Sequence, residues 1–141
     1  MAEIRRKIGS QAGPSLAPEY NFVIVEGSDD ILGEGSLHAV DYRNRVGQIG
    51  ICIWKEQDRR HGHASDAVGQ LLAWATGCLG LQRIEAWVND GNQASAALFV
   101  RLGFVHEGTL SRRYFALGRW HAVRVYGYLT TSPSGFAAVS E

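Results

Sequence analysis

The chain has 141 residues, of which 45% are hydrophobic and 20% are charged, so it has the size and composition of one globular domain. Its 14 Lys and Arg residues balance 14 Asp and Glu residues, whereas proteins that bind nucleic acid or anionic membranes carry a basic excess. No apolar run reaches the roughly 18 residues that a membrane span needs. Cys52 and Cys78 lie far apart without a CxxC spacing, so neither a disulfide nor a metal site is expected. A chain without disulfides suits a reducing compartment, and the cytoplasm is therefore the expected location.

The N-terminal half of the chain is predicted to begin with a partly flexible leader over residues 1–20, which shows no sustained hydrophobic period. Three strands then follow at about 21–26, 31–40 and 45–54, because short apolar or alternating runs are separated by turn residues. These three strands are expected to form a β-meander.

The hydrophobic period changes after the third strand. From Ala64 the apolar residues recur at the i, i+3, i+4, i+7 spacing of an amphipathic helix, which Gly80 is expected to end. The remaining predicted elements are a strand over 81–88, a helix over about 93–102 behind the turn Asn89–Asn92, and strands near 104–109 and 120–129 that flank a polar connection.

The predicted order is therefore β-β-β-α-β-α-β-β. It favours an α/β fold, in which helices pack on one mixed sheet. We expect a single domain over residues 21–130, followed by a flexible tail over 131–141.

The segment Arg59–Ala64 lies between a predicted strand and the first predicted helix. A helix N-terminus has unpaired backbone N–H groups and a partial positive charge, so it suits a phosphate. Gly62 lets the backbone approach such a ligand, and the small side chain of Ala64 leaves room for it. Alternatively, the segment is a basic turn that only begins a helix, because short glycine motifs match often. The residues predicted to hold the phosphate are Arg59, Arg60, His61, Gly62, His63, Ala64 and Ser65, with the two histidine side chains facing solvent.

This hexapeptide resembles the Gln/Arg-x-x-Gly-x-Gly/Ala signature of the GNAT acyltransferases. Further along, Asn92–Phe104 is similar to the second signature of that family, Asn-x-x-Ser/Ala-x-x-Leu-Tyr-x-Lys-x-Gly-Phe. Asp41–Arg45 before a Gly-x-Ile-Gly strand, and the segment Leu110–His121, resemble the ribosomal-protein and polyamine N-acetyltransferases within the family. The resemblance covers about residues 21–130.

The resemblance implies a GNAT fold and acetyl-CoA as co-substrate, with the pyrophosphate cradled by the amides of the loop. The acetyl group would pass directly to a primary amine of a small molecule or peptide. Backbone groups near Ile51 and Ile53 would hold the pantetheine in a slot where the third strand splays from its neighbour. Asn92 would hydrogen-bond the pantetheine arm.

Two positions depart from the family pattern. Phe99 stands where relatives carry a tyrosine, so it can pack against the cofactor but donates no proton. Gln48 replaces a common glutamate and cannot act as a base. Ser95 either assists the departing thiolate or only contacts the cofactor, and Tyr114 either faces the acceptor or only packs.

Glu34 and His38, on the second predicted strand, are interpreted as hydrogen-bonded or solvent-exposed polar residues. The family normally begins with a strand and one or two helices, whereas only about 20 residues here precede what resembles its second strand. Either this leader is a shortened version of those elements or another subunit supplies them. We expect a homodimer that covers apolar surface otherwise protected by those elements.

Three functions are consistent with the sequence. The first is an acetyl-CoA-dependent N-acetyltransferase. The second is a non-catalytic acyl-CoA-binding or regulatory module that keeps the loop but lacks the acid and the base. The third is a structural domain with a coincidental loop.

Overall fold

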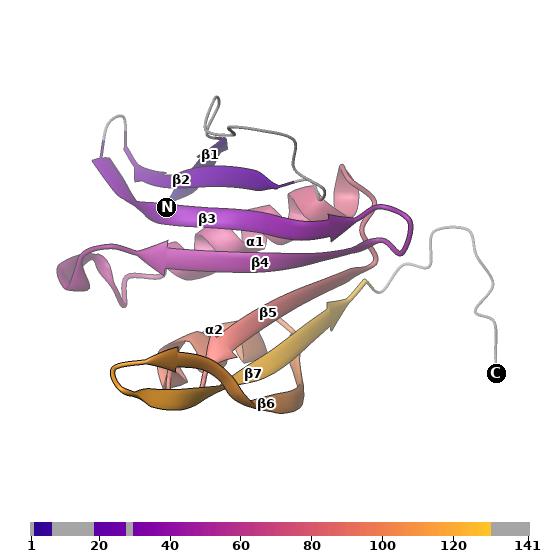
Figure 1. Ribbon diagram of the computed structural model, residues 1–141. Helices are drawn as coiled ribbons and strands as arrows, with labels where there is room; N and C mark the ends of the chain where they lie inside the picture. The colour runs from indigo at the N-terminus through magenta and orange to yellow at the C-terminus, as the bar shows by residue number, and fades with distance from the viewer. Residues whose placement is uncertain (1, 7–18, 28–29, 131–141) are drawn as a thin grey trace.

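The computed structural model describes residues 2–6, 19–27 and 30–130, which form a single sheet with helices on it (Figure 1). The strands are β1 Glu3–Arg6, β2 Tyr20–Glu26, β3 Asp30–Asp41, β4 Val46–Ile53, β5 Arg83–Asn89, β6 Val105–Ala116 and β7 Arg119–Leu129; the helices are the short 3₁₀ helix η1 Glu56–Asp58, α1 His63–Gly77 and α2 Gln93–Arg101. The spatial order of the strands is β1-β2-β3-β4-β5-β7-β6, and β4 with β5 is the parallel pair. Within these residues, no helix has the length and apolar character needed to cross a membrane.

The predicted mixed sheet is confirmed, with one additional strand at its edge. The sequence predicted no strand within the partly flexible leader 1–20, but Glu3–Arg6 form one and pair with β2 from Glu3–Val25 to Arg6–Phe22. The backbone N–H of Ile4 also donates to the side-chain oxygen of Gln70 in α1, at 3.2 Å. A strand of four residues is too short to show a hydrophobic period. Residues 7–18 and the predicted tail 131–141 lie outside the described residues.

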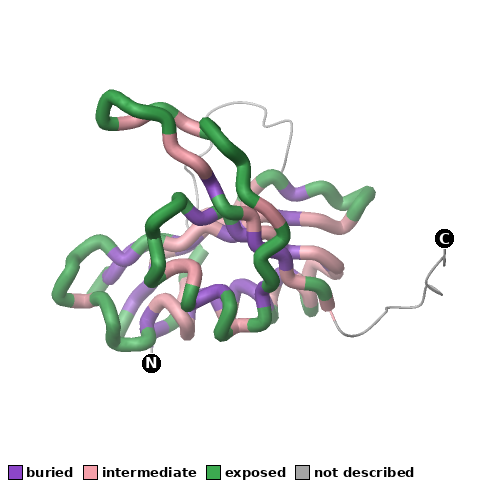
Figure 2. The backbone as a smooth tube through the Cα atoms, turned by 90° about the horizontal axis from the view of Figure 1, so that it is seen from below, coloured by how far each residue is buried: buried purple, intermediate pink, exposed green. Residues whose placement is uncertain are grey.

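The main core lies between the sheet and the two α-helices, which cover the same face of the sheet (Figure 1). Figure 2 shows many of the buried residues near the centre of the molecule, while exposed residues occupy turns and also most of β6. The predicted apolar stripe of α1 is confirmed, since Val68, Leu71 and Ala75 are all fully buried. Burial of a large aliphatic side chain contributes about 1.5–3 kcal/mol, so this stripe fixes α1 against β3 and β4.

The predicted polar connection between the last two strands is wrong for most of its length. β6 continues to Ala116, and β7 begins at Arg119, so the connection is Leu117–Gly118. The pairing of β6 with β7 shifts register between His106 and Gly108 and again between Leu110 and Tyr114. The first shift adds one residue to β6 and so reverses the alternation of its side chains. The second shift adds two residues, and together the shifts interrupt the two-residue period that marks a strand.

A pair of glycine substitutions tests how closely β3 and β4 approach. A Cβ added at Gly33 would lie 2.0 Å from the carbonyl oxygen of Cys52, so Gly33→Ala must push the two strands apart. We expect a loss of about 1–3 kcal/mol in the free energy of unfolding, measured by urea denaturation. Gly69 in α1 has no atom within 4 Å of an added Cβ, so Gly69→Ala should instead gain about 0.5–1 kcal/mol. Equal stability of Gly33→Ala and the parent would contradict this packing.

Candidate functional site

The start of α1 is shaped by Gly62, the N-cap residue of the helix. Its φ of 81° lies in the left-handed region that favours glycine, and no atom lies within 4 Å of a Cβ added there. Because glycine has no capping side chain, no side-chain hydrogen bond caps the first turn of α1. The helix start thus combines open space with backbone donors, as an anion site requires.

The loop before α1 is fastened to the end of β4. Nε of Arg59 donates to the carbonyl oxygen of Ile53 at 3.2 Å, and the Nε2 atom of His61 lies 3.0 Å from the carbonyl oxygen of Gln57. Arg59, Arg60 and His61 are exposed, as predicted for a basic loop, and Ser65 is half-buried in the first turn of α1. These contacts bring the predicted phosphate loop next to the predicted pantetheine strand.

His63 does not face solvent as the sequence predicted. It is the first residue of α1 and only 9% exposed. Its Nε2 lies 3.6 Å from a carboxylate oxygen of Glu26, while Nδ1 has no hydrogen-bond partner among the described residues. The prediction fails because His63 already lies within the helix, one turn before the fully buried Ala67, and therefore shares the core-facing side.

The parallel strands β4 and β5 separate toward their carboxyl ends, and the place where their pairing stops is called the slot from here on. These parallel strands pair from Val46–Arg83 to Ile49–Ala86 and then separate, since β5 continues against β7 as far as Asn89 (Figure 1). The end of β4 therefore has no β5 partner beyond Ile49, and both Ile51 and Ile53 lie in this unpaired stretch. The predicted splay is present.

Both α-helices begin just beyond this slot, because each follows the carboxyl end of one of the two parallel strands. Ligands of open α/β sheets bind outside such carboxyl ends. On the β5 side, Asn92 is the N-cap of α2, and its Oδ1 accepts a hydrogen bond from the backbone N–H of Ser95 at 3.2 Å. The Oδ1 atom thus stabilises the helix, and the amide nitrogen of Asn92 is left as its donor toward a ligand.

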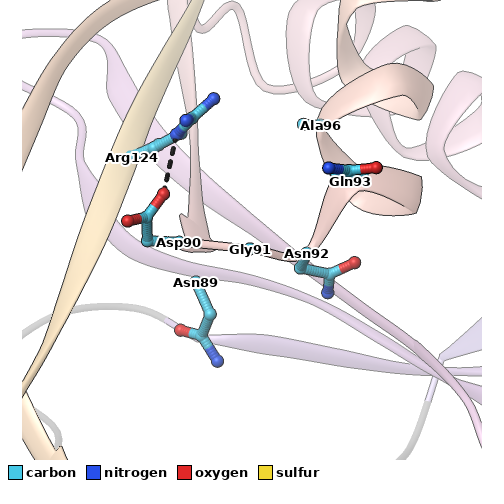
Figure 3. A pocket seen from close by; sticks show the side chains of 7 residues that line it. All are labelled: Asn89, Asp90, Gly91, Asn92, Gln93, Ala96 and Arg124. Carbon is cyan, nitrogen blue, oxygen red and sulfur yellow. Dashed lines mark hydrogen bonds and ion pairs between the residues drawn. The ribbon is translucent and has the colours of Figure 1, made fainter.

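A cavity of about 310 Å³ lies beside the start of α2 (Figure 3). An ion pair between Asp90 and Arg124, with 3.1 Å between Oδ1 and Nε, stands opposite Gln93 and Ala96 of α2. The sequence did not predict that Arg124 lines this cavity, because Arg124 comes from β7 and no motif includes it. The lining residues are Asn89, Asp90, Gly91, Asn92, Gln93, Ala96 and Arg124.

The two aromatic candidates lie in different surroundings. Phe99 is 3% exposed, and its ring meets Phe104 edge to face with centroids 5.0 Å apart. Tyr114 lies in the β6–β7 hairpin and stacks on His121 at 4.8 Å, so the packing that the sequence allowed for Tyr114 is observed. Catalytic roles for Tyr114 and Ser95 stay predictions.

The sheet face without helices carries a charged cluster, which consists of Arg83 and Glu85 of β5 and Glu107 of β6. The guanidinium of Arg83 contacts the carboxylate of Glu85 at 3.0 Å and also that of Glu107. Its hydrogen bond to Glu107 lowers the pKa of that carboxyl group and raises the pKa of Arg83. Both oxygens of Glu85 are engaged, because the second accepts from the indole nitrogen of Trp87 at 3.2 Å.

A family model described as an acetyltransferase (GNAT) domain matches residues 2–105 of the chain. The match includes the loop before α1, the slot and the whole of α2.

Two relatives have similar sequences. The uncharacterized N-acetyltransferase YoaA of Bacillus subtilis is 32% identical over 97 residues, which cover 69% of this chain and 54% of YoaA. The spermidine N(1)-acetyltransferase of Vibrio cholerae is 27% identical over 106 residues, which cover 75% of this chain and 61% of the relative. The chain thus spans between half and two thirds of the length of these relatives.

Solved structures of the Vibrio cholerae enzyme have the same fold. Its complex with CoA and spermine superposes with a TM-score of 0.74 at 26% identity, covering 79% of this chain and 65% of the other. Its dodecameric form gives a TM-score of 0.73 at 26% identity, covering 79% and 64%.

Proposed function

The chain belongs to the GNAT acetyltransferase family, and we propose that it transfers the acetyl group of acetyl-CoA directly to a primary amine. The observation that carries this proposal is the slot between β4 and β5, placed beside the glycine-capped start of α1. The start of α1 would hold the pyrophosphate. The free edge of β4 would hold the pantetheine through main-chain hydrogen bonds, as it would hold an added β-strand.

The proposed reaction depends mainly on alignment. The amine attacks the thioester carbonyl, and fixing both reactants in the slot replaces an encounter in solution. The backbone N–H groups at the end of β4 supply donors toward the developing oxyanion. Asn92 would fix the pantetheine arm through its amide nitrogen.

The proposed acceptor is a small-molecule or peptide amine. The Vibrio cholerae relative acts, by its name, on spermidine, which supports a polyamine as one candidate. The formal net charge of zero gives no support to nucleic-acid or membrane partners. We also propose a cytoplasmic location, because Cys52 and Cys78 are exposed free thiols.

A non-catalytic acyl-CoA-binding module is the second candidate. The observation that favours it concerns Phe99, which is buried in the core. This residue stands where the second family signature has a tyrosine. Gln48 adds to this, because an amide accepts no proton from the incoming amine.

Gly62→Val tests the placement of the cofactor. A branched side chain at this N-cap would stand where the backbone must meet the pyrophosphate, so acetyl-CoA affinity should fall at least tenfold, or about 1.4 kcal/mol, by calorimetry. Gly80→Val is the matched control, because Gly80 also has a positive φ, 70°, and open space around it. Both variants place valine at a positive φ, so an equal affinity of the two folded variants for acetyl-CoA would contradict the placement of the pyrophosphate at this loop.

Phe99→Tyr separates the enzyme from the binding module. We expect weak thiol release from acetyl-CoA with a panel of amines, because general acid assistance is worth about 10²–10⁴ in rate and is absent here. The tyrosine should raise kcat by more than it changes acetyl-CoA affinity. Phe104→Tyr, which adds a hydroxyl to the neighbouring buried ring, should raise neither kcat nor the affinity for acetyl-CoA. Tight acetyl-CoA binding without transfer by the parent or Phe99→Tyr would favour the binding module.

Self-association is a further part of the proposed function. The β6–β7 hairpin exposes Phe115, Trp120 and Leu117, the last 95% exposed, and apolar groups so placed favour a protein contact. The dodecameric form of the Vibrio cholerae relative supports this proposal. We expect light scattering to give the mass of a dimer, and Leu117→Asp combined with Trp120→Asp to give one chain. A parent mass of one chain at micromolar concentration would contradict a dimer.

A further inference from the structure

The open face of the sheet carries a histidine at the slot. Both α-helices pack on the other face, so alternate side chains of β3 and β4 project onto the side without helices (Figure 1). Ser36 and His38 of β3 lie on this open face, opposite Gly50 and Gln48 of β4 in the pairing register. The side chains of Ser36 and His38 are half-buried.

The histidine is held by its neighbour on the same strand. Oγ of Ser36 and Nδ1 of His38 lie 3.0 Å apart and share a hydrogen bond. When Nδ1 carries the proton and donates it to Oγ, the lone pair of the ring lies on Nε2. Nε2 can then accept a proton from a ligand.

Because Gly50 has no side chain, the side chains of Ser36 and His38 can lie close to its Cα. A Cβ added at Gly50 would lie 3.0 Å from Oγ of Ser36 and 3.6 Å from Cε1 of His38. Gly50 is also the first residue of β4 beyond the last pair with β5, Ile49–Ala86. The imidazole therefore borders the slot at the point where β4 and β5 separate.

The neighbouring polar groups on this face are less suited to accept a proton. Gln48, directly across from His38, is an amide and is not basic. Both carboxylate oxygens of Glu85, across from Gln48, are bound by Arg83 and Trp87. Glu34 lies further along β3, exposed and opposite Cys52.

We propose that His38 is the base of the transfer, and this rests on the proposed function. Nε2 takes one proton from the alkylammonium ion, and the neutral amine attacks the thioester carbonyl to form the C–N bond. The C–S bond then breaks with its electron pair on sulfur. The nitrogen loses its second proton to the thiolate, and His38 returns its proton to solvent, so the products are the amide, CoA thiol and one proton. Ser36 is a positioning residue in this step.

The test compares steady-state rates with acetyl-CoA and the best amine of the panel. His38→Gln should lower kcat by about 10²-fold, within the range for a lost general base, and leave the Kd for acetyl-CoA within twofold. Imidazole in the buffer should restore part of the rate of His38→Ala, which a merely structural role would not predict. Ser36→Ala should lower kcat by a smaller factor. His106→Gln is the control, because His106 is an exposed residue of β6 bonded to Thr109; its kcat should equal that of the parent.

The outcomes separate this inference from the proposed function. A parent that acetylates amines together with an unchanged kcat in folded His38→Gln would overturn the role of His38 alone. A parent that binds acetyl-CoA but acetylates no amine would overturn both. Should neither His38 variant fold, Ser36→Ala decides, because it keeps the imidazole and removes its only observed hydrogen-bond partner among the described residues; an unchanged kcat would then overturn the proposal.

Discussion

The end of the pairing between β4 and β5 is the constraint on which the candidate site depends. Beyond Ile49 and Ala86, β4 remains paired with β3 while β5 follows β7, so the two parallel strands separate. Backbone polar groups at the end of β4 then need partners other than a strand, since unpaired buried groups are costly. Because both strands are parallel and each leads into a helix, the starts of α1 and α2 are both brought to this opening. The proposed phosphate site at the start of α1 and the proposed pantetheine strand β4 thereby become neighbours.

Two glycines, Gly62 and Gly50, leave space near this opening, one on each face of the sheet. On the helix side, the left-handed Gly62 begins α1 without a capping side chain. On the open side, the absence of a side chain at Gly50 makes room for Ser36 and His38. These two glycines act differently, since the first supplies a backbone conformation and the second supplies space.

The departures from the family pattern concern proton transfer rather than cofactor binding. The loop before α1 and the splayed strands are both present, while Phe99 and Gln48 lack the proton chemistry of the residues they replace. A thioester needs less acid assistance than an amide, because a thiol with an ordinary pKa of about 8.5 is a fair leaving group. An incoming ammonium ion, however, cannot attack until it loses a proton. The base is therefore the more demanding requirement, and His38 stands across the ladder from Gln48, where that function is missing.

The sequence by itself determined the mixed α/β fold, the apolar stripe of α1 and the turn Asn89–Asn92 before α2, because periodicity and turn residues are local properties of the chain. The tertiary structure alone decided the rest. Strand β1 is too short to carry a period, and the register shifts in β6 interrupt its alternation. His63 turned inward because α1 begins one residue earlier than predicted. His38 acquired its position relative to Gly50 only through the register of β3 on β4, since which side chains face each other across a ladder is fixed by non-local hydrogen bonds that no single segment encodes.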